Sequence, residues 1–177
     1  MATETYTLED AEQEIAGLRS ELATLEEDTR FVAAAAVKPS DESRSTQTLA
    51  NDGDLAITGL LAGTYEFAGN LGFTAGTTGD IQWTWVVSPG ATMRYTAVTN
   101  TAGAAATSDA KVQWNLGSDT ATAGGLPGAL VTPVLMGGTL IITADGGSLT
   151  LQWARANSDT TATVLKAQSY IRLTRIA

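Results

Sequence analysis

The chain has 177 residues, 44% of them hydrophobic, which is the composition of a soluble globular protein with one domain and an appendage. It contains no cysteine and no histidine, which excludes disulfides, thiolate chemistry, a conventional Ser-His-Asp triad and the commonest zinc ligand. The net charge is −9, and residues 1–44 hold eleven of the acidic side chains against four basic ones, so we do not expect the chain to bind nucleic acid.

The first predicted element is a helix over residues 8–37 that carries a heptad pattern. Its apolar residues recur in steps of three and four, the spacing of coiled-coil a and d positions. These positions are Leu8, Ala11, Ile15, Leu18, Leu22, Leu25, Thr29 and Val32. The run Ala33 to Ala36 favours continuation of the helix, and Pro39 ends it. The pattern predicts a coiled-coil stalk over residues 1–38 that associates copies of the chain.

Two points about this helix stay open. An amphipathic helix that folds back onto its own domain is the alternative, although the stripe is as narrow as a coiled-coil seam. The a and d residues do not decide between two, three or four chains, and four heptads are marginal alone, so the following domain must share the association. The first ten residues show neither the basic region nor the apolar run of a secretory signal peptide. No stretch approaches the roughly 20 apolar residues that span a bilayer.

Residues 39–53 are polar and predict a linker, with room for a short strand around Thr46–Ala50. Residues 54–177 then lack helical periodicity and alternate apolar with polar side chains between turn residues. The strongest strand candidates are Thr64–Thr74, Asp80–Val87, Thr92–Thr99, Lys111–Asn115, Thr139–Ala144, Ser148–Ala156 and Thr163–Ile176. Strands at this spacing without intervening helices predict a mainly β fold, an antiparallel β-sandwich of jelly-roll-like type. The stretches 102–109 and 117–128 are predicted as long loops.

Aromatic faces bind sugar rings, so the four tryptophans invite a carbohydrate-binding hypothesis. Trp83 and Trp85 alternate in phase with apolar neighbours, as Trp153 does, so these three are predicted to pack in the core. Trp114 lies on a weaker strand and is the best candidate for an exposed ring. With Tyr95, it is the residue that we would test for ligand contact.

The sequence predicts no catalytic residue, cofactor site or metal site. A glycosidase needs two carboxylates across a cleft, and no spacing marks such a pair. The stretches 51–54 (Asn-Asp-Gly-Asp) and 145–147 (Asp-Gly-Gly) hold too few oxygen ligands for calcium, and turn chemistry explains them equally well. Lys166, Arg172 and Arg175 lie on an otherwise apolar C-terminal strand, where they face either water or an acidic neighbour across a subunit interface.

Three segments resemble the virion structural proteins of tailed bacteriophages, of head decoration or fibre and minor tail type. They are Thr77–Trp83 (TTGDIQW), Leu149–Ala154 (LTLQWA) and Val164–Ile176 (VLKAQSYIRLTRI), within the last 130 residues. The resemblance implies a C-terminal jelly-roll-like β-sandwich that often forms trimers. It also implies that the protein is located in the virion. The implied partners are other copies of the same chain and the capsid or tail proteins.

The sequence and the resemblance together predict a non-enzymatic, homotrimeric accessory protein that decorates the capsid surface. Only about seven residues precede the coil, which favours a head decoration over a distal fibre with its own attachment domain. The alternative is a tail or fibre receptor-binding protein that recognises a host-surface glycan.

Overall fold

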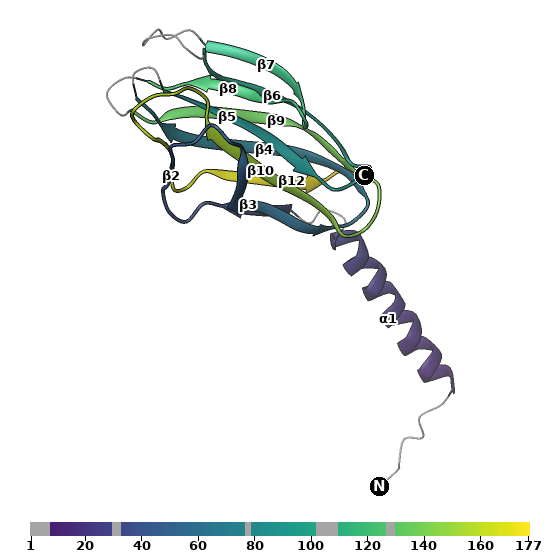
Figure 1. The fold of residues 1–177 in the computed structure, drawn as a ribbon. Coiled ribbons are helices and arrows are strands. Elements are labelled where there is room, and N and C mark those ends of the chain that lie inside the picture. Colours follow the sequence, from purple (N-terminus) through teal and green to yellow (C-terminus); the bar gives the residue numbers. More distant parts are fainter. Residues whose placement is uncertain (1–7, 30–32, 77–78, 102–109, 127–129) are drawn as a thin grey trace. The chain divides into compact units, whose positions relative to one another are not determined.

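The computed structural model describes residues 8–29, 33–76, 79–101, 110–126 and 130–177 (Figure 1). The chain divides into two compact units, Met1–Val32 and Ala33–Ala177. The first unit contains helix α1 (Leu8–Thr29), as the heptad pattern predicts, and the second contains twelve described strands. Among the described residues, no helix is both long enough and apolar enough to cross a membrane.

Eight strands of the second unit form one antiparallel sheet, called here the eight-stranded sheet. Its main path runs β1-β12-β4-β9-β6-β7, and β11 pairs with both β2 and β4. The bounds are β1 (Ala33–Val37), β12 (Tyr170–Arg175), β4 (Gly63–Thr74), β9 (Thr132–Ile142), β6 (Thr92–Asn100), β7 (Ala110–Leu116), β11 (Thr163–Leu165) and β2 (Glu42–Arg44).

The remaining four strands form a second antiparallel sheet in the order β3-β10-β5-β8, the four-stranded sheet. The bounds are β3 (Ala50–Leu60), β10 (Gly147–Arg155), β5 (Asp80–Val87) and β8 (Ala121–Gly124). The two sheets pack face to face as a β-sandwich, which confirms the mainly β, antiparallel prediction (Figure 1).

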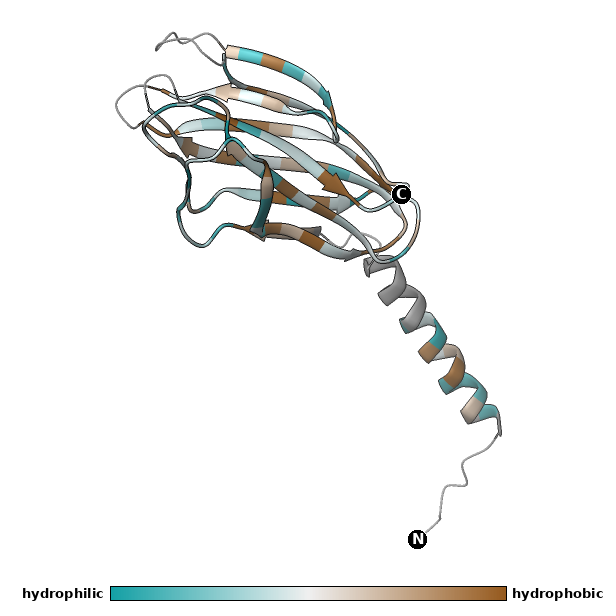
Figure 2. Ribbon diagram, in the orientation of Figure 1, coloured by the Kyte–Doolittle hydropathy of each residue, from teal (hydrophilic) through white to brown (hydrophobic). Residues whose placement is uncertain are grey.

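The core lies between the sheets because each strand alternates buried and exposed residues, visible as alternating hydropathy in Figure 2. Three aromatic rings join the two layers. Trp85 of β5 meets Phe67 of β4 edge-on at a centroid distance of 5.1 Å and Tyr95 of β6 at 6.3 Å. Edge-to-face pairs of this kind stabilise a core beyond the area that they bury.

The strand predictions hold for β4, β5, β6, β7 and β10, whose bounds differ by a residue or less at either end. The prediction of Thr139–Ala144 was too short, because β9 begins at Thr132. The sequence pattern did not indicate its first half, because Pro133, Gly137 and Gly138 are all unfavourable in a strand. Gly138 is required there, because a Cβ would overlap the Arg94 carbonyl oxygen and Tyr95.

The single strand predicted over Thr163–Ile176 was also wrong, because it is two strands, β11 and β12. A turn separates them, in which Gln168 has a positive φ of 67°. The amide of Lys166 donates to the Gly72 carbonyl oxygen at 2.8 Å, which holds this turn against β4. Gln168 carries no sequence signature of that conformation, so the pattern alone did not reveal the break.

The prediction for residues 33–53 was wrong in three respects. The helix does not continue to residue 37, because Ala33–Val37 is strand β1, paired with β12. The predicted linker contains β2 and the start of β3, and the strand expected around Thr46–Ala50 is absent apart from Ala50. The β unit therefore begins at Ala33 and not at residue 54. An alanine run favours a helix locally, but the open edge of β12 supplies backbone partners that override this preference.

Candidate functional site

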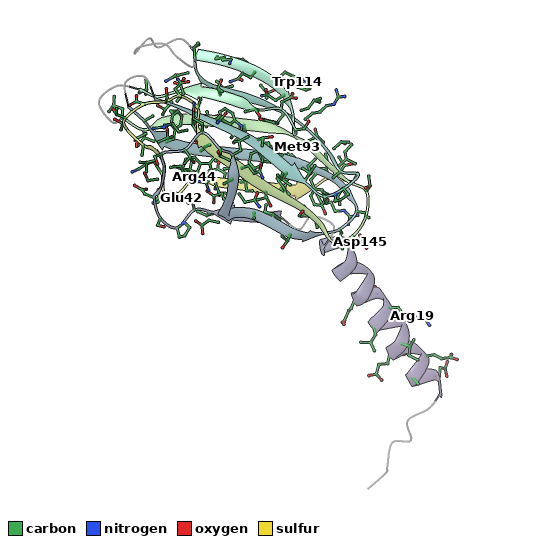
Figure 3. The ribbon with its side chains drawn as sticks, viewed as in Figure 1. Arg19, Glu42, Arg44, Met93, Trp114 and Asp145 are labelled. Atoms are coloured by element: carbon green, nitrogen blue, oxygen red, sulfur yellow. The ribbon has the colours of Figure 1, made fainter. Side chains whose placement is uncertain are left out.

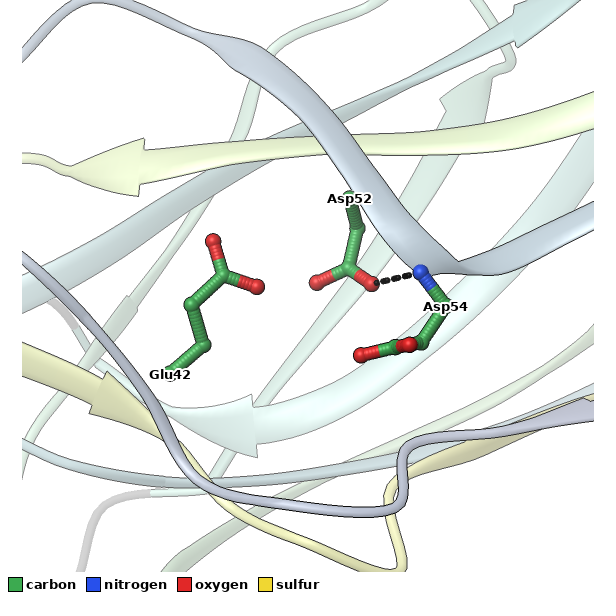
Figure 4. A group of neighbouring side chains, drawn as sticks. All are labelled: Glu42, Asp52 and Asp54. Carbon is green, nitrogen blue, oxygen red and sulfur yellow. Dashed lines mark hydrogen bonds between the residues drawn. The ribbon is translucent and has the colours of Figure 1, made fainter.

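A buried lysine at the end of β1 holds three carboxylates around its ammonium group. Lys38 Nζ lies 2.6 Å from Glu42 Oε2, 2.9 Å from Asp52 Oδ2 and 3.0 Å from Asp54 Oδ2. Figure 4 shows the three carboxylates facing one another from two separate segments of the chain. The cluster joins residues 38–42, which follow a strand of the eight-stranded sheet, to β3 of the four-stranded sheet.

Asp52 is the centre of this cluster because its two carboxylate oxygens accept four hydrogen bonds. Oδ1 accepts from the backbone amides of Asp54 and Leu55, each at 2.9 Å. Oδ2 accepts from Lys38 Nζ and from Trp153 Nε1, the latter also at 2.9 Å. A register shift between β10 and β3 at this point lets the Asp52 side chain enter the interior.

The electrostatics of the cluster favour an ion pair over neutral groups. Burial alone lowers the pKa of Lys38, but its hydrogen bonds to the three carboxylates outweigh burial and leave the pKa above the ordinary value. Burial alone raises the pKa of Asp52, but its bonds from Lys38 and from the amides of Leu55 and Asp54 leave the pKa below its usual range. Both groups are therefore charged at neutral pH.

The oxygen donors of Glu42, Asp52 and Asp54 lie within 4.8 Å of one another, an arrangement that can also hold a metal ion. Here the ammonium of Lys38 supplies the cation, so the cluster is an ion-pair network that connects the two sheets. Of the two stretches considered for calcium, 51–54 contributes two carboxylates to this network. In the other, Asp145 Oδ1 accepts from the Ala62 amide at 2.8 Å, a bond between two loops that are distant in the sequence.

Arg44 reinforces the same network from β2. Its guanidinium lies 4.2 Å from the centroid of the Trp153 ring and donates to the carbonyl oxygens of Ala50 and Asn51 at 2.7 and 2.9 Å. Its Nε also donates to Glu42 Oε1 at 2.8 Å, so Glu42 bridges Lys38 and Arg44. No sequence pattern predicted this cluster, because its members are separated in the chain and meet only through the sheet pairing.

The structure separates the aromatic candidates. Trp83, Trp85 and Trp153 are buried, which confirms the prediction that they belong to the core. Trp114 is 69% exposed on β7, as predicted (Figure 3). The prediction of Tyr95 as a surface contact was wrong: its side chain is 0% exposed, and burial raises its pKa to about 12. Tyr95 lies on the inward-facing positions of β6, where period-two alternation with Met93 and Ala97 could have placed it.

Trp114 belongs to an extended apolar surface on the outside of the eight-stranded sheet. The strand registers align outward-facing residues in rows across β1, β12, β4, β9, β6 and β7. The exposed large hydrophobic residues in these rows are Val37, Tyr170, Leu135, Val98, Val112, Trp114, Leu116 and Ile141. We call this surface the apolar face.

The outside of the four-stranded sheet has different chemistry. Its registers place hydroxyl and amide side chains next to one another on β3, β10, β5 and β8. These are Thr58, Ser148, Thr150, Gln152, Gln82 and Thr122, while Thr84 on the same side is buried and donates to the Gly117 carbonyl oxygen. Val86 is the exposed large hydrophobic residue among them. We call this surface the polar face.

Helix α1 places the predicted seam residues Ala11, Ile15 and Leu18 on one side by helical geometry. Ile15 is 49% exposed and Leu18 is 59% exposed. Leu8, Leu22, Leu25 and Thr29 belong to the same helix, but their side chains lie outside the described part of the structure, and so does Val32 as a whole.

No protein-family model matches the chain, and no curated protein matches it. Among solved structures, the chain is similar to "Structure of infectious bursal disease virus Gx strain", with 10% sequence identity and a TM-score of 0.21. The match covers 82% of this chain and 41% of the viral one, so the chain spans well under half the length of that protein. A likeness at this TM-score carries no argument about fold or function.

Proposed function

We propose that this chain is a non-catalytic structural protein of a phage virion, a homotrimer that decorates the capsid surface. The observation that carries the proposal is the exposed seam of α1. Ile15 and Leu18 are half exposed on a single copy, at heptad positions that become buried when helices associate. A four-heptad coil is marginal alone, so copies joined by it also need contacts between their β units.

The strand order supports a jelly roll as the fold of the β unit. Strands β3 to β10 divide into β3-β10-β5-β8 on one sheet and β4-β9-β6-β7 on the other. Eight antiparallel strands shared in this way between two sheets are the arrangement of double-sheet jelly rolls, which are common in viral capsid proteins. A fold alone does not define a function, and the virion assignment rests on the resemblance of the three segments.

Two of those segments meet in the core. Trp83 of β5 pairs with Trp153 of β10, and both indoles are buried. The shared motifs therefore build the sandwich instead of lining a cleft, which favours a structural role over a catalytic one.

Light scattering on the full-length chain tests the homotrimer. We expect a mass of about 55 kDa, three times the 18.3 kDa of one copy, and a lower mass for Leu18→Asp, which places a charge in the seam. The far-UV circular dichroism of Leu18→Asp should retain the cooperative β transition. A monomeric wild-type chain would refute the trimer.

The virion location needs a separate experiment. Purified particles from a lysate of cells that carry this gene are probed with an antibody against residues 33–177. Detection in intact heads supports the decoration role, and detection in tails alone supports the fibre alternative. Absence from particles contradicts both.

A receptor-binding module for a host-surface glycan is the second candidate, and the exposed ring of Trp114 favours it. An aromatic face that is open to solvent can stack on a sugar ring. Trp114→Ala should then abolish binding to purified cell-wall polysaccharide while the far-UV circular dichroism of the β unit stays unchanged. Unaltered binding by that variant would remove the support for this candidate.

A further inference from the structure

The apolar face is large enough to be a complete protein interface. Six strands spaced about 4.8 Å apart span about 24 Å, and the nine residues from Thr64 to Gly72 of β4 span about 27 Å along the strands. The product, about 650 Å², is close to the roughly 800 Å² that each partner buries in a stable interface. This area includes polar and charged residues, among them Arg172, Glu66 and Arg94, so the exposed hydrophobic side chains occupy only part of it.

The two edges of the apolar face differ in the size of their side chains. On β7, Val112, Trp114 and Leu116 are all exposed and bulky. On β1 the corresponding row ends in the exposed Ala35, which is paired with Arg172 of β12. In this row the β7 edge carries a bulky ring and the β1 edge a small side chain, so these two positions of neighbouring copies are complementary in size, whereas the row of Val112 ends in the bulkier Val37.

The row through Trp114 makes this complementarity specific. From β1 to β7 it reads Ala35, Arg172, Ala68, Gly137, Thr96 and Trp114. Its centre consists of the small residues Ala68, Gly137 and Thr96, and its β1 end is the small Ala35 beside Arg172. A rotation axis parallel to the strands keeps equal rows at equal height, which places Trp114 of one copy beside Ala35 and Arg172 of the next. An arginine over a tryptophan ring is a favourable pair.

Charge also fits a second copy of the same chain. The adjacent row places Glu66 on β4 and Arg94 on β6, with Thr139 of β9 between them. Under the same rotation Arg94 of one copy moves towards Glu66 of the next, so opposite charges meet. Residues 33–177 carry ten acidic and eight basic side chains, so repulsion between the β units is small.

We propose that the apolar face is the contact surface between copies of this chain, with the β7 edge of one copy packed against the β1–β12 side of the next. This inference rests on the proposed homotrimer and adds to it which surface of the β unit is buried. The face then supplies the association that the short coil lacks.

A matched pair of valines tests the proposal. Val98 lies on the apolar face and is 40% exposed, and Val86 lies on the polar face and is 42% exposed. Light scattering over a dilution series of the full chain should show that Val98→Glu raises the dissociation constant at least 100-fold. Val86→Glu should leave it unchanged, because only Val98→Glu buries a charge against a partner.

The results separate this inference from the proposed function. If wild type is a trimer and both variants remain trimers, the apolar face is not the interface although the homotrimer stands. If wild type is a monomer, the homotrimer itself fails. Far-UV circular dichroism shows whether Val98→Glu is folded.

Disulfide cross-linking decides the question even if Val98→Glu does not fold. The chain has no cysteine of its own, and positions 35 and 114 lie at opposite edges of the sheet, about 24 Å apart, too far for a bond within one copy. Ala35→Cys combined with Trp114→Cys should give covalent dimers and trimers with oxidised glutathione. The control, Val86→Cys combined with Trp114→Cys, should give none. Equal cross-linking in both, or none in the first, overturns the proposal.

Discussion

The two sheets of the sandwich have the same antiparallel pairing but opposite outer chemistry. The polar face presents hydroxyl and amide groups that water can solvate, with Val86 as an isolated apolar residue. The apolar face presents exposed valines, leucines and aromatic rings on several strands, with charged residues such as Arg94 and Arg172 between them. Backbone pairing does not distinguish these sheets. The outside of the four-stranded sheet therefore suits water in a single copy, whereas the outside of the eight-stranded sheet is the surface that we propose another copy covers.

The sheets also differ in how their interior is filled. The four-stranded sheet contributes Trp83, Trp85 and Trp153, and one of these indoles, that of Trp153, donates to Asp52 in the lysine cluster. That cluster connects the segment after β1 to β3, so it ties one sheet to the other. The stability of a single copy should therefore depend on this interior, and association should depend on the apolar face.

The largest expected effect comes from the buried tryptophan of the four-stranded sheet. Trp83→Ala should lower the free energy of unfolding by about 3–5 kcal/mol, because it leaves a cavity as well as losing buried apolar area. Urea denaturation followed by far-UV circular dichroism measures the loss. Trp114→Ala is the matched control and should change the intrinsic stability of one copy by about 0.5 kcal/mol or less. Comparable losses of unfolding free energy in the two variants would show that stability does not depend on the interior more than on the surface.

Removal of the ion pairs between Lys38 and its carboxylates should lower the free energy of unfolding by nearly as much. Lys38→Met keeps much of the side-chain volume but leaves Asp52 buried without its cation, which costs about 3 kcal/mol or more. Lys166→Met is the matched control, since Lys166 pairs with Asp41 at the surface and should cost far less. The same urea titration compares both. If Lys38→Met is no worse than Lys166→Met, the cluster does not hold the sheets together.

Much of this fold was predictable because its strands carry a period-two pattern. Asp80–Val87 was predicted to the residue, since Ile81, Trp83 and Trp85 alternate without interruption. Strand β1 was not predictable, because four alanines followed by a valine carry no period and only pairing with β12 makes them a strand. Local pattern determines elements that bury their own side chains, and it fails where a partner strand decides.

The candidate surfaces were less predictable than the strands. Trp114 could be singled out as an exposed ring from its weak strand, but the face around it could not. Val37, Leu135 and Val112 lie far apart in the sequence and share that face only through the register of β1, β9 and β7. Tyr95 failed as a candidate although its alternation with Met93 and Ala97 indicated the buried side of β6.

The lysine cluster also predicts how stability depends on pH. The pKa of Asp52 is lowered in the folded chain, so its contribution is present above the unfolded value of about 3.9 and is lost as pH falls through the folded pKa. The pKa of Lys38 is raised, so its contribution is present below about 10.4 and is lost as pH rises through the folded pKa. Thermal melts should therefore show a plateau between these limits.

Lys38→Met sharpens this pH prediction. In the variant, Asp52 has lost the cation that lowers its pKa, so Asp52 is protonated at a higher pH than in wild type and the difference in melting temperature should shrink as pH falls from neutral. A constant difference at every pH would show that Asp52 does not depend on Lys38 for its ionisation.

The smallest expected effect on stability comes from Val98→Thr and Val86→Thr, one substitution on each outer face. On one copy the two valines are almost equally exposed, at 40% and 42%, so burial within the chain predicts the same cost, below about 1 kcal/mol, for each. If copies cover the apolar face, Val98→Thr replaces a methyl group in a dry contact by a hydroxyl, and Val86→Thr makes the same change in contact with water. Thermal melts at two protein concentrations should show equal shifts for the pair in dilute protein and a larger loss for Val98→Thr in concentrated protein, because association stabilises only the covered face. Equal shifts at both concentrations would mean that the apolar face stays in water, and the contrast between the sheets would then have no consequence for assembly.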